Sequence, residues 1–340
     1  MASVKRKKLS KAKTAAIISA AAVFVVFVSL LITNIFVPVK YLTAYMVVAE
    51  QRQEGTLTVT YADVGYGDAI LIELPDGKVA LIDGGDGAYG NTLSLLRLLN
   101  SRGVDKIDYL ICSSVRAEHC GGLAEIIKYK QVGTIYAPYV NNTYITDAYR
   151  NFYAAAEDEG AEMLISQYGE GIYSDEYSYF LTFLSPGGAD NPLGYYAALN
   201  KEASEENILN ACAVVWLSYA GTSFVFTSSA GGAALNSIIQ DYEIMTAAGD
   251  KYAQTGSYSV SLEDCDVVQV AGHGSADCTS AEWYGVLSPS AAVISVGDNF
   301  AGCPSSQALS DVCSQVKEPL STQNRGNITI RVTSDGYAVL

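Results

Sequence analysis

The chain has 340 residues, 49% of them hydrophobic and 17% charged, and its formal net charge is −15 at pH 7. This length suits one large domain or two small ones, and the apolar content excludes a disordered polymer. Six basic and no acidic residues lie among the first 13, so the rest carries 15 basic against 36 acidic side chains, a net charge of −21. Such a surface disfavours non-specific binding to nucleic acid.

Residues 14–39 form an apolar run without a charged side chain. A helix needs about 20 residues to cross a bilayer, whereas the apolar region of a cleaved signal peptide has about 7–15. We therefore expect an uncleaved anchor at 14–39. The basic tail at 1–13 places the N-terminus in the cytoplasm and the rest outside, as a single-pass protein of the cell membrane. Residues 40–55 are interpreted as a stalk.

Strand and helix patterns alternate from residue 56 to the C-terminus. We expect strands at 58–61, 69–74, 79–82, 107–112, 132–137 and 179–184, and helices at 91–102, 123–129 and 144–157. The polar stretch 188–207 is expected to be a surface loop. Strands at 211–217 and 223–227 follow, and a hairpin of 327–332 with 337–340 closes the chain. This interleaving predicts one α/β sandwich over 56–340 rather than two domains.

Six short sequence motifs occur in this part of the chain. In one-letter code they are DVGYGDAI at 63–70, LIDGG at 81–85, SSVRAEHCGG at 113–122, VFTSS at 225–229, GHGS at 272–275 and SVGDNFAGCP at 295–304. In this order they resemble the metallo-β-lactamase fold. In particular they resemble the extracytoplasmic domain of the ComEC-type DNA-uptake competence protein and its stand-alone relatives, which read DVGQGDA, LIDxG, THxHxDHxGG, LLTGD, HHGS and SVGxxNxxGHP.

The resemblance implies a four-layer αββα sandwich with its active site on loops at one edge of two sheets. In the family these loops bind one or two ions, usually zinc or manganese. The ions activate water for hydrolysis of an ester, phosphodiester or amide bond. The competence protein has many membrane spans and this sequence shows one apolar run, so the resemblance does not extend to a DNA channel.

Most family ligand positions carry other side chains here. His119 and one histidine of the HHGS pair, His273, are retained, and they are the two histidines of the chain. The remaining ligand positions are taken by Ser114, Arg116, Glu118, Ser229 and Cys303. A guanidinium is always charged and cannot coordinate a cation, so we expect Arg116 to replace lost positive charge and to pair with Glu118.

Two interpretations of the site stay open. Glu118, His119 and His273 are weak candidates for a single or rearranged zinc or manganese site, whereas the favoured interpretation is a retained fold without a cofactor. Asp63, Asp68 and Asp83 match positions kept in the family, with Asp83 expected to accept backbone hydrogen bonds in its glycine turn. Tyr66 stands at the family's glutamine position, where it would face the pocket.

The cysteines leave a further choice. Seven are present, an odd number, so at least one is free or pairs with another chain. Cys120, Cys278 and Cys303 fall on loops that rim the implied pocket, where we expect a disulfide rather than a soft zinc site.

The sequence therefore predicts an anchored, extracytoplasmic ComEC-like protein that binds or scaffolds an unidentified partner at the cell surface. The alternative is a divergent metallo-hydrolase acting on phosphodiesters such as nucleic acid.

Overall fold

The computed structural model describes the backbone of residues 11–36, 39–50, 52–140, 146–188 and 194–340. The chain divides into two compact units, 1–47 and 48–340. The first contains helix α1 (Lys11–Phe36) and the 3₁₀ helix η1 (Val39–Tyr45). Apolar side chains of α1, among them Ile17, Val23 and Phe24, are exposed. Among the described residues, no helix is both long and apolar enough to cross a membrane. The anchor at 14–39 therefore stays a prediction.

The second unit contains two sheets. The eight-stranded sheet has the order β15-β14-β1-β2-β3-β4-β5-β6. Its strands are β1 (Leu57–Tyr61), β2 (Ile70–Glu73), β3 (Val79–Ile82), β4 (Lys106–Ile111), β5 (Gln131–Ala137), β6 (Glu162–Ile165), β14 (Ile328–Thr333) and β15 (Gly336–Val339). Strands β3 to β6 run parallel, while β1 pairs antiparallel with both β2 and β14.

The seven-stranded sheet has the order β13-β12-β11-β10-β9-β8-β7. Its strands are β7 (Gly171–Ser174), β8 (Tyr179–Ser185), β9 (Val214–Tyr219), β10 (Thr222–Phe226), β11 (Val267–Gln269), β12 (Ala291–Ile294) and β13 (Leu320–Ser321). Strands β10 to β13 run parallel. Val59 and Ile72 of the first sheet share one buried cluster with Phe183, Leu217 and Phe224 of the second, so the two sheets pack face to face.

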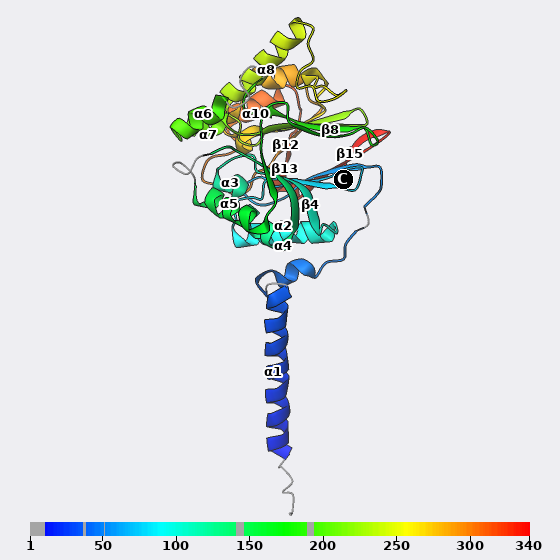
Figure 1. Ribbon diagram of the computed structural model, residues 1–340, viewed down its shortest axis with the longest axis vertical. Helices are drawn as coiled ribbons and strands as arrows, with labels where there is room; N and C mark the ends of the chain where they lie inside the picture. The colour runs from blue at the N-terminus through cyan, green and yellow to red at the C-terminus, as the bar shows by residue number, and fades with distance from the viewer. Residues whose placement is uncertain (1–10, 37–38, 51, 141–145, 189–193) are drawn as a thin grey trace, which may run out of the picture. The chain divides into compact units, whose positions relative to one another are not determined.

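Helices cover the outer face of each sheet (Figure 1). On the first sheet lie α2 (Tyr89–Ser101), α4 (Leu123–Tyr129) and α5 (Asp147–Glu159), with buried faces that include Leu96, Ile126 and Phe152. On the second lie α8 (Gly232–Ala247), α9 (Ala281–Leu287) and α10 (Ser306–Cys313), which share a core with Trp216 and Val268. The predicted α/β fold with two sheets between helical layers is confirmed.

The expectation of a surface loop at 188–207 is wrong for its described part. Residues from 194 onward form α6 (Gly194–Lys201) and α7 (Glu205–Asn210), while 189–193 lie outside the described residues. Ser204 caps α7 by accepting a hydrogen bond from the Asn207 amide at 3.3 Å. Tyr196 and Leu199 of α6 are buried. Two partly buried helices, the second of them capped by Ser204, thus lie inside a stretch whose composition is polar.

Strand ends converge at one edge of the sandwich and carry the short helices α3 (Ala117–Cys120), η3 (Ala271–Gly274) and η4 (Ala276–Cys278). The remaining short elements are η2 (Leu262–Asp264) and α11 (Thr322–Arg325). Carboxyl ends of parallel strands meet at one edge of a sheet, and ligand sites of open α/β sheets lie there. This edge is where the motif residues are found.

Candidate functional site

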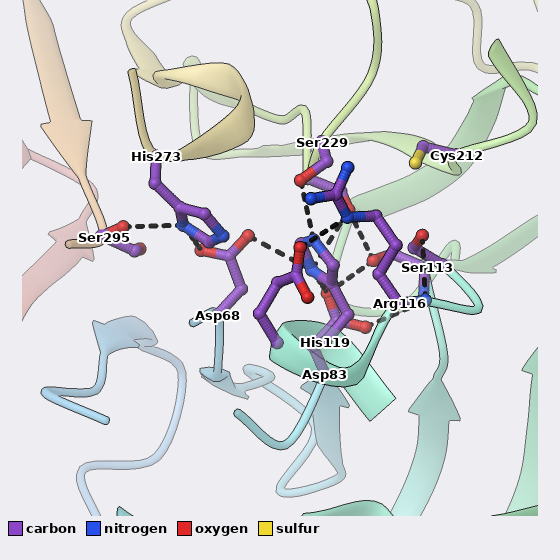
Figure 2. Close-up of polar contacts among 12 residues, drawn as sticks. Asp68, Asp83, Ser113, Arg116, His119, Cys212, Ser229, His273 and Ser295 are labelled. Carbon is purple, nitrogen blue, oxygen red and sulfur yellow. Dashed lines mark hydrogen bonds and ion pairs between the residues drawn. The ribbon is translucent and has the colours of Figure 1, made fainter. Parts of the chain in front are cut away.

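The site is assembled from loops that follow the strand ends. Asp83 follows β3, Ser113 lies two residues beyond β4, and His119 is in α3. On the second sheet, Ser228 and Ser229 follow β10, and His273 follows β11. Asp68 lies just before β2, and its amide donates to the Glu118 carbonyl at 3.0 Å. Backbone contacts of this kind fix the loops against one another, so the polar side chains meet in a buried cluster (Figure 2).

His119 lies at the centre of this cluster. Its Nδ1 is 3.0 Å from Asp83 Oδ2 and 3.4 Å from Asp68 Oδ2, and its Nε2 is 2.7 Å from Ser229 Oγ. The imidazole is fully buried, as are both carboxylates. Each ring nitrogen of His119 therefore already has a protein partner (Figure 2).

Asp83 joins the loops after β3, β4 and β10. Its backbone has a φ of 62°, and its Oδ1 accepts the Ser113 amide at 2.8 Å. Its Oδ2 accepts from the Ser113 hydroxyl, whose Oγ lies 2.6 Å from Ser228 Oγ. Asp83 thus accepts a backbone hydrogen bond from the loop after β4, and not from its own glycine turn as expected. In addition, this carboxylate orients His119.

His273 lies beside Asp68 on the other side of the cluster. Its Nδ1 donates to the Ser295 carbonyl at 2.8 Å and is 3.8 Å from Asp68 Oδ1. The His119 and His273 rings stack with centroids 5.5 Å apart, and Tyr66 packs against His273 at 4.6 Å. Both oxygens of Asp68 and Nε2 of His273 are buried and have no hydrogen-bond partner. Buried polar atoms in this state point to a missing ligand, water or ion.

The two histidines differ in charge. Burial lowers the pKa of His119, but the Asp83 carboxylate and then Asp68 outweigh it and raise that pKa to about 9. For His273, burial and repulsion from His119 keep the pKa below its usual value, despite attraction from Asp68. Burial also raises the pKa of Asp68, against the attraction of both histidines. At neutral pH the cluster thus contains an imidazolium at His119 and a neutral imidazole at His273.

Arg116 forms an ionic link at the outer side of the cluster. Its Nε pairs with Glu118, as expected from the sequence, and its Nη1 pairs with Glu205 at the start of α7. Burial opposes ionisation of Glu118, but His119 and Arg116 hold the pKa of that carboxyl below its usual range. Glu118 is therefore engaged by a guanidinium and lies outside the group of possible ligands.

The other predicted site residues are distributed around the cluster. Ser114 is buried, with its Oγ 3.4 Å from the Arg116 amide. Cys303 lies on the His273 side, 3.8 Å from the Tyr66 hydroxyl. All seven cysteines, which lie within the described residues, are free thiols. The expected disulfide among Cys120, Cys278 and Cys303 is absent because these thiols face the backbone oxygens of Arg116, Ser229 and Gly272.

The donor set can be tested against the metal centre that the sequence resemblance implies. Two ions do not fit, because Ser114, Arg116 and Ser229 stand at ligand positions and Arg116 brings a fixed positive charge. For one ion, Asp68, His119 and His273 each offer a ligand atom within 4.8 Å of the others. An ion would have to displace Ser229 from Nε2 of His119 or Asp83 from Nδ1.

Sequence reasoning did not identify Asp68 as a member of this group. From the sequence Asp68 only matches a position kept in the family, yet it is the carboxylate between the two histidines. The available signal was its place in DVGYGDAI immediately before a strand, at the same edge as the His119 loop. Ser228 and Ser295 were missed as well, since nothing in their local sequence indicates contact with His119 or His273.

No protein-family model and no curated protein matches the chain. Solved structures of similar fold include a HARLDQ-motif mutant of a metallo-β-lactamase from Cronobacter sakazakii (Enterobacter sakazakii), with a TM-score of 0.32 and 16% identity over 56% of this chain and 71% of that one. The metal-dependent β-lactamase-superfamily hydrolase Tm1679 has a TM-score of 0.43 and 12% identity over 78% of this chain and 96% of its own. CmlA β-hydroxylase has a TM-score of 0.47 and 12% identity; the match covers 83% of this chain and 55% of the enzyme. At these values the similarity says nothing of a shared substrate or activity.

Proposed function

We propose that this chain is an anchored, extracytoplasmic, ComEC-like protein of the metallo-β-lactamase fold that has lost metal-dependent hydrolysis and binds a partner at the cell surface. The observation that carries the loss of chemistry is the state of His119. Both of its nitrogens are bound by protein groups, and the raised pKa gives it a positive charge between two aspartates. The imidazolium supplies the charge that a cation would otherwise supply to these carboxylates.

Arg116 supports the same proposal. A catalytic metal site keeps a position open to water and substrate. Here the acidic and imidazole groups are buried, and Arg116 ties the α3 loop to Glu205 of α7 on the outer side. This link holds the α3 loop, which carries His119, to the start of α7.

The anchor and the location rest on sequence. Six basic side chains precede an uncharged apolar run at 14–39. The ComEC-like assignment rests on six motifs in family order. The acidic domain disfavours nucleic acid as the partner, and 24 tyrosines suit recognition of a protein, peptide or glycan.

A second candidate function is favoured by Asp68 and His273. Both oxygens of Asp68 and Nε2 of His273 make no hydrogen bond, and with His119 beside them they would suit a single zinc or manganese ion. Such an ion would supply Lewis-acid activation of water and of a phosphodiester. Asp83 and the Ser295 carbonyl would then orient the two histidines, as second partners of metal-bound imidazoles commonly do.

A hydrolysis assay separates the two candidates. The full chain in detergent is incubated with a chromogenic phosphodiester and with single-stranded DNA, each with added zinc, manganese or chelator. We expect no turnover above buffer in any condition. The hydrolase would be the correct function if turnover is observed, is abolished by chelator, and is lost in both Asp68→Asn and His273→Gln. The binding function would then be rejected. The Glu263→Gln variant, changed at an exposed position on η2 that is no part of the cluster, is the matched control.

A further inference from the structure

The two partners of His119 are those of a serine–histidine–aspartate triad. Asp83 Oδ2 lies 3.0 Å from Nδ1 of His119, and Ser229 Oγ lies 2.7 Å from its Nε2 (Figure 2). In such a triad the carboxylate orients the imidazole through Nδ1, and Nε2 takes the proton of the serine hydroxyl as that oxygen attacks a carbonyl carbon. Triads occur on unrelated folds and in several chain orders, so geometry identifies them and sequence position does not.

Ser229 lies on a turn that joins a strand to a helix. Strand β10 ends at Phe226, and α8 begins at Gly232. Ser228, immediately before Ser229, has a φ of 51°, a left-handed conformation that is uncommon for residues other than glycine. Strained backbone of this kind clusters at active sites, and a sharp strand-to-helix turn is a common place for a nucleophilic serine. The local backbone therefore suits a nucleophile at Ser229.

The surroundings of the three residues suit acyl transfer. The Asp83 carboxylate is fixed, because its Oδ1 accepts a hydrogen bond from the Ser113 amide at 2.8 Å. Helix α8 begins three residues after Ser229, so the partial positive charge of its N-terminus lies next to the turn. A positive charge at this place stabilises the oxyanion that forms when a serine attacks a carbonyl carbon.

A cavity of about 220 Å³ adjoins the same turn. Gly231, two residues after Ser229, lines it, and all the charged side chains of its lining are acidic, namely Glu205, Glu206 and Asp277. Both glutamates are exposed, so the cavity opens to solvent. Carboxylates repel an anion, so an acyl group held in a cavity of this size would be small and either neutral or positively charged.

We propose that Ser229 and His119, positioned by Asp83, hydrolyse carboxylic esters that have a small, neutral or positively charged acyl group. Ser229 Oγ attacks the ester carbonyl carbon, and its proton passes to Nε2 of His119. The ester C–O bond breaks, the alcohol leaves with that proton, and the acyl group stays on Ser229. A water molecule then attacks the acyl carbon and gives a proton to Nε2, and this proton returns to Ser229 as the acid leaves.

This activity rests on the metal-free cluster of the proposed function, because an ion on His119 would displace Ser229 or Asp83. Burial lowers the pKa of His119, but Asp83 and then Asp68 raise it to about 9. A general base acts in its neutral form, so the reaction is slow at neutral pH and faster above pH 9. The experiment therefore compares pH 7 with pH 10.

A serine-directed probe tests the site before its natural ester is known. The full chain in detergent is incubated with a fluorophosphonate, which loses fluoride when a serine oxygen attacks its phosphorus. Trypsin cleaves after Lys201 and Lys251, so Ser229 lies in the peptide 202–251, and fragmentation in the mass spectrometer distinguishes it from Ser228. We expect one adduct in this peptide, on Ser229, that forms faster at pH 10 than at pH 7.

Variants separate the roles of the three residues. Ser229→Ala should carry no adduct, and His119→Gln should form it about 10²–10⁴-fold more slowly. Ser257→Ala, changed at an exposed serine outside the cluster, should be labelled like the wild type. Asp83→Asn should be labelled more slowly and with a lower pH midpoint, because its amide no longer raises the pKa of His119. A merely structural role of Asp83 would leave that midpoint unchanged.

The wild-type chain decides the case even if a variant does not fold. Absence of an adduct on Ser229 at both pH values, or equal labelling of a folded His119→Gln chain, would overturn the proposal. If the adduct forms only after treatment with chelator, the metal-free cluster is overturned while the triad stands.

Two chromogenic esters test the substrate class. Relative to hydrolysis in buffer, 4-nitrophenyl acetate should react about tenfold faster than the anionic 4-nitrophenyl hydrogen succinate, because the cavity is acidic. Equal relative rates for the two esters would overturn the assigned acyl group, and no turnover of the acetate at pH 10 would overturn the esterase.

Discussion

At the scale of single residues, the site depends on one protonated histidine. His119 is fully buried, yet two carboxylates hold its pKa at about 9. An imidazolium between Asp68 and Asp83 balances charges that would otherwise be costly to bury. The same contact explains why the neighbouring histidine stays neutral, since a second positive charge beside His119 is repelled. The charge of this site is thus set by a proton on His119.

This arrangement predicts a pH-dependent stability. The pKa of His119 is higher in the folded chain, at about 9, than the usual 6.5 of an unfolded histidine. Its contribution is therefore fully present below pH 6.5 and is lost as pH rises through 9. Between pH 6.5 and 9 the free energy of unfolding, measured with denaturant, should fall less in His119→Gln than in the wild type. The expected difference is on the order of 3 kcal/mol.

His273 provides the control for that measurement. Because its pKa is lowered, it is neutral throughout the same window, so His273→Gln should keep the wild-type pH dependence. If His119→Gln and the wild type lose stability in parallel between pH 6.5 and 9, His119 is not the charged group and the metal-free interpretation of the cluster fails.

At the scale of elements, glycines let the site loops lie backbone against backbone. A Cβ at Gly122 would lie 2.1 Å from the Gly84 carbonyl oxygen, and one at Gly67 would lie 2.6 Å from that of Glu118. Gly122 has an ordinary φ of −85°, so close approach, and not backbone conformation, requires the glycine. This packing holds α3, and with it His119, against the turn after β3.

The close approach predicts a large cost for a single methyl group. Gly122→Ala should lower the free energy of unfolding by about 3 kcal/mol, the upper range for overpacking. Gly285→Ala in α9 meets nothing within 4 Å and should be neutral or stabilising by up to about 1 kcal/mol. Chemical denaturation of both variants tests this, and equal stabilities would show that the loops yield to a methyl group.

The strands of both sheets were predictable where buried side chains dominate. The segments 58–61, 79–82 and 179–184 match β1, β3 and β8 to within one residue. By contrast β6 was missed because its side chains alternate between exposed and half-buried, and β7 because it is only four residues long with one buried side chain. The segments of α6 and α7 were expected to be a surface loop because their composition is polar. However, Ser204 followed by Glu205 and Glu206 is a helix-start signal.

At the site, the sequence predicted which motif residues lie near the pocket, but it did not predict which of them contact one another. The sequence identified His119, His273, Ser229 and Arg116 as pocket residues, and the structure brings the first three around one cluster. It assigned Glu118 as a weak ligand, whereas the Arg116 guanidinium engages that carboxylate. Asp68 was missed because a carboxylate 51 positions before His119 becomes its neighbour only through sheet topology.

At the scale of the whole molecule, we propose that the acidic domain lies outside the membrane and the basic tail lies in the cytoplasm. Protease added to intact cells should degrade the domain and leave only an N-terminal fragment with the anchor, because the positive-inside rule orients the chain this way. A cytoplasmic protein in the same cells serves as the control for lysis. Full protection of the domain until the cells are opened would reverse the proposed topology.

The most direct test of the central claim is the metal content of the purified full chain. The protein is prepared without a histidine tag, incubated with zinc and manganese, desalted and analysed by elemental mass spectrometry. The account predicts less than roughly a tenth of an equivalent, because His119 is protonated and bound on both nitrogens. About one equivalent of zinc or manganese, lost in Asp68→Asn and His273→Gln but retained in Glu263→Gln, would contradict it and establish a single-ion site.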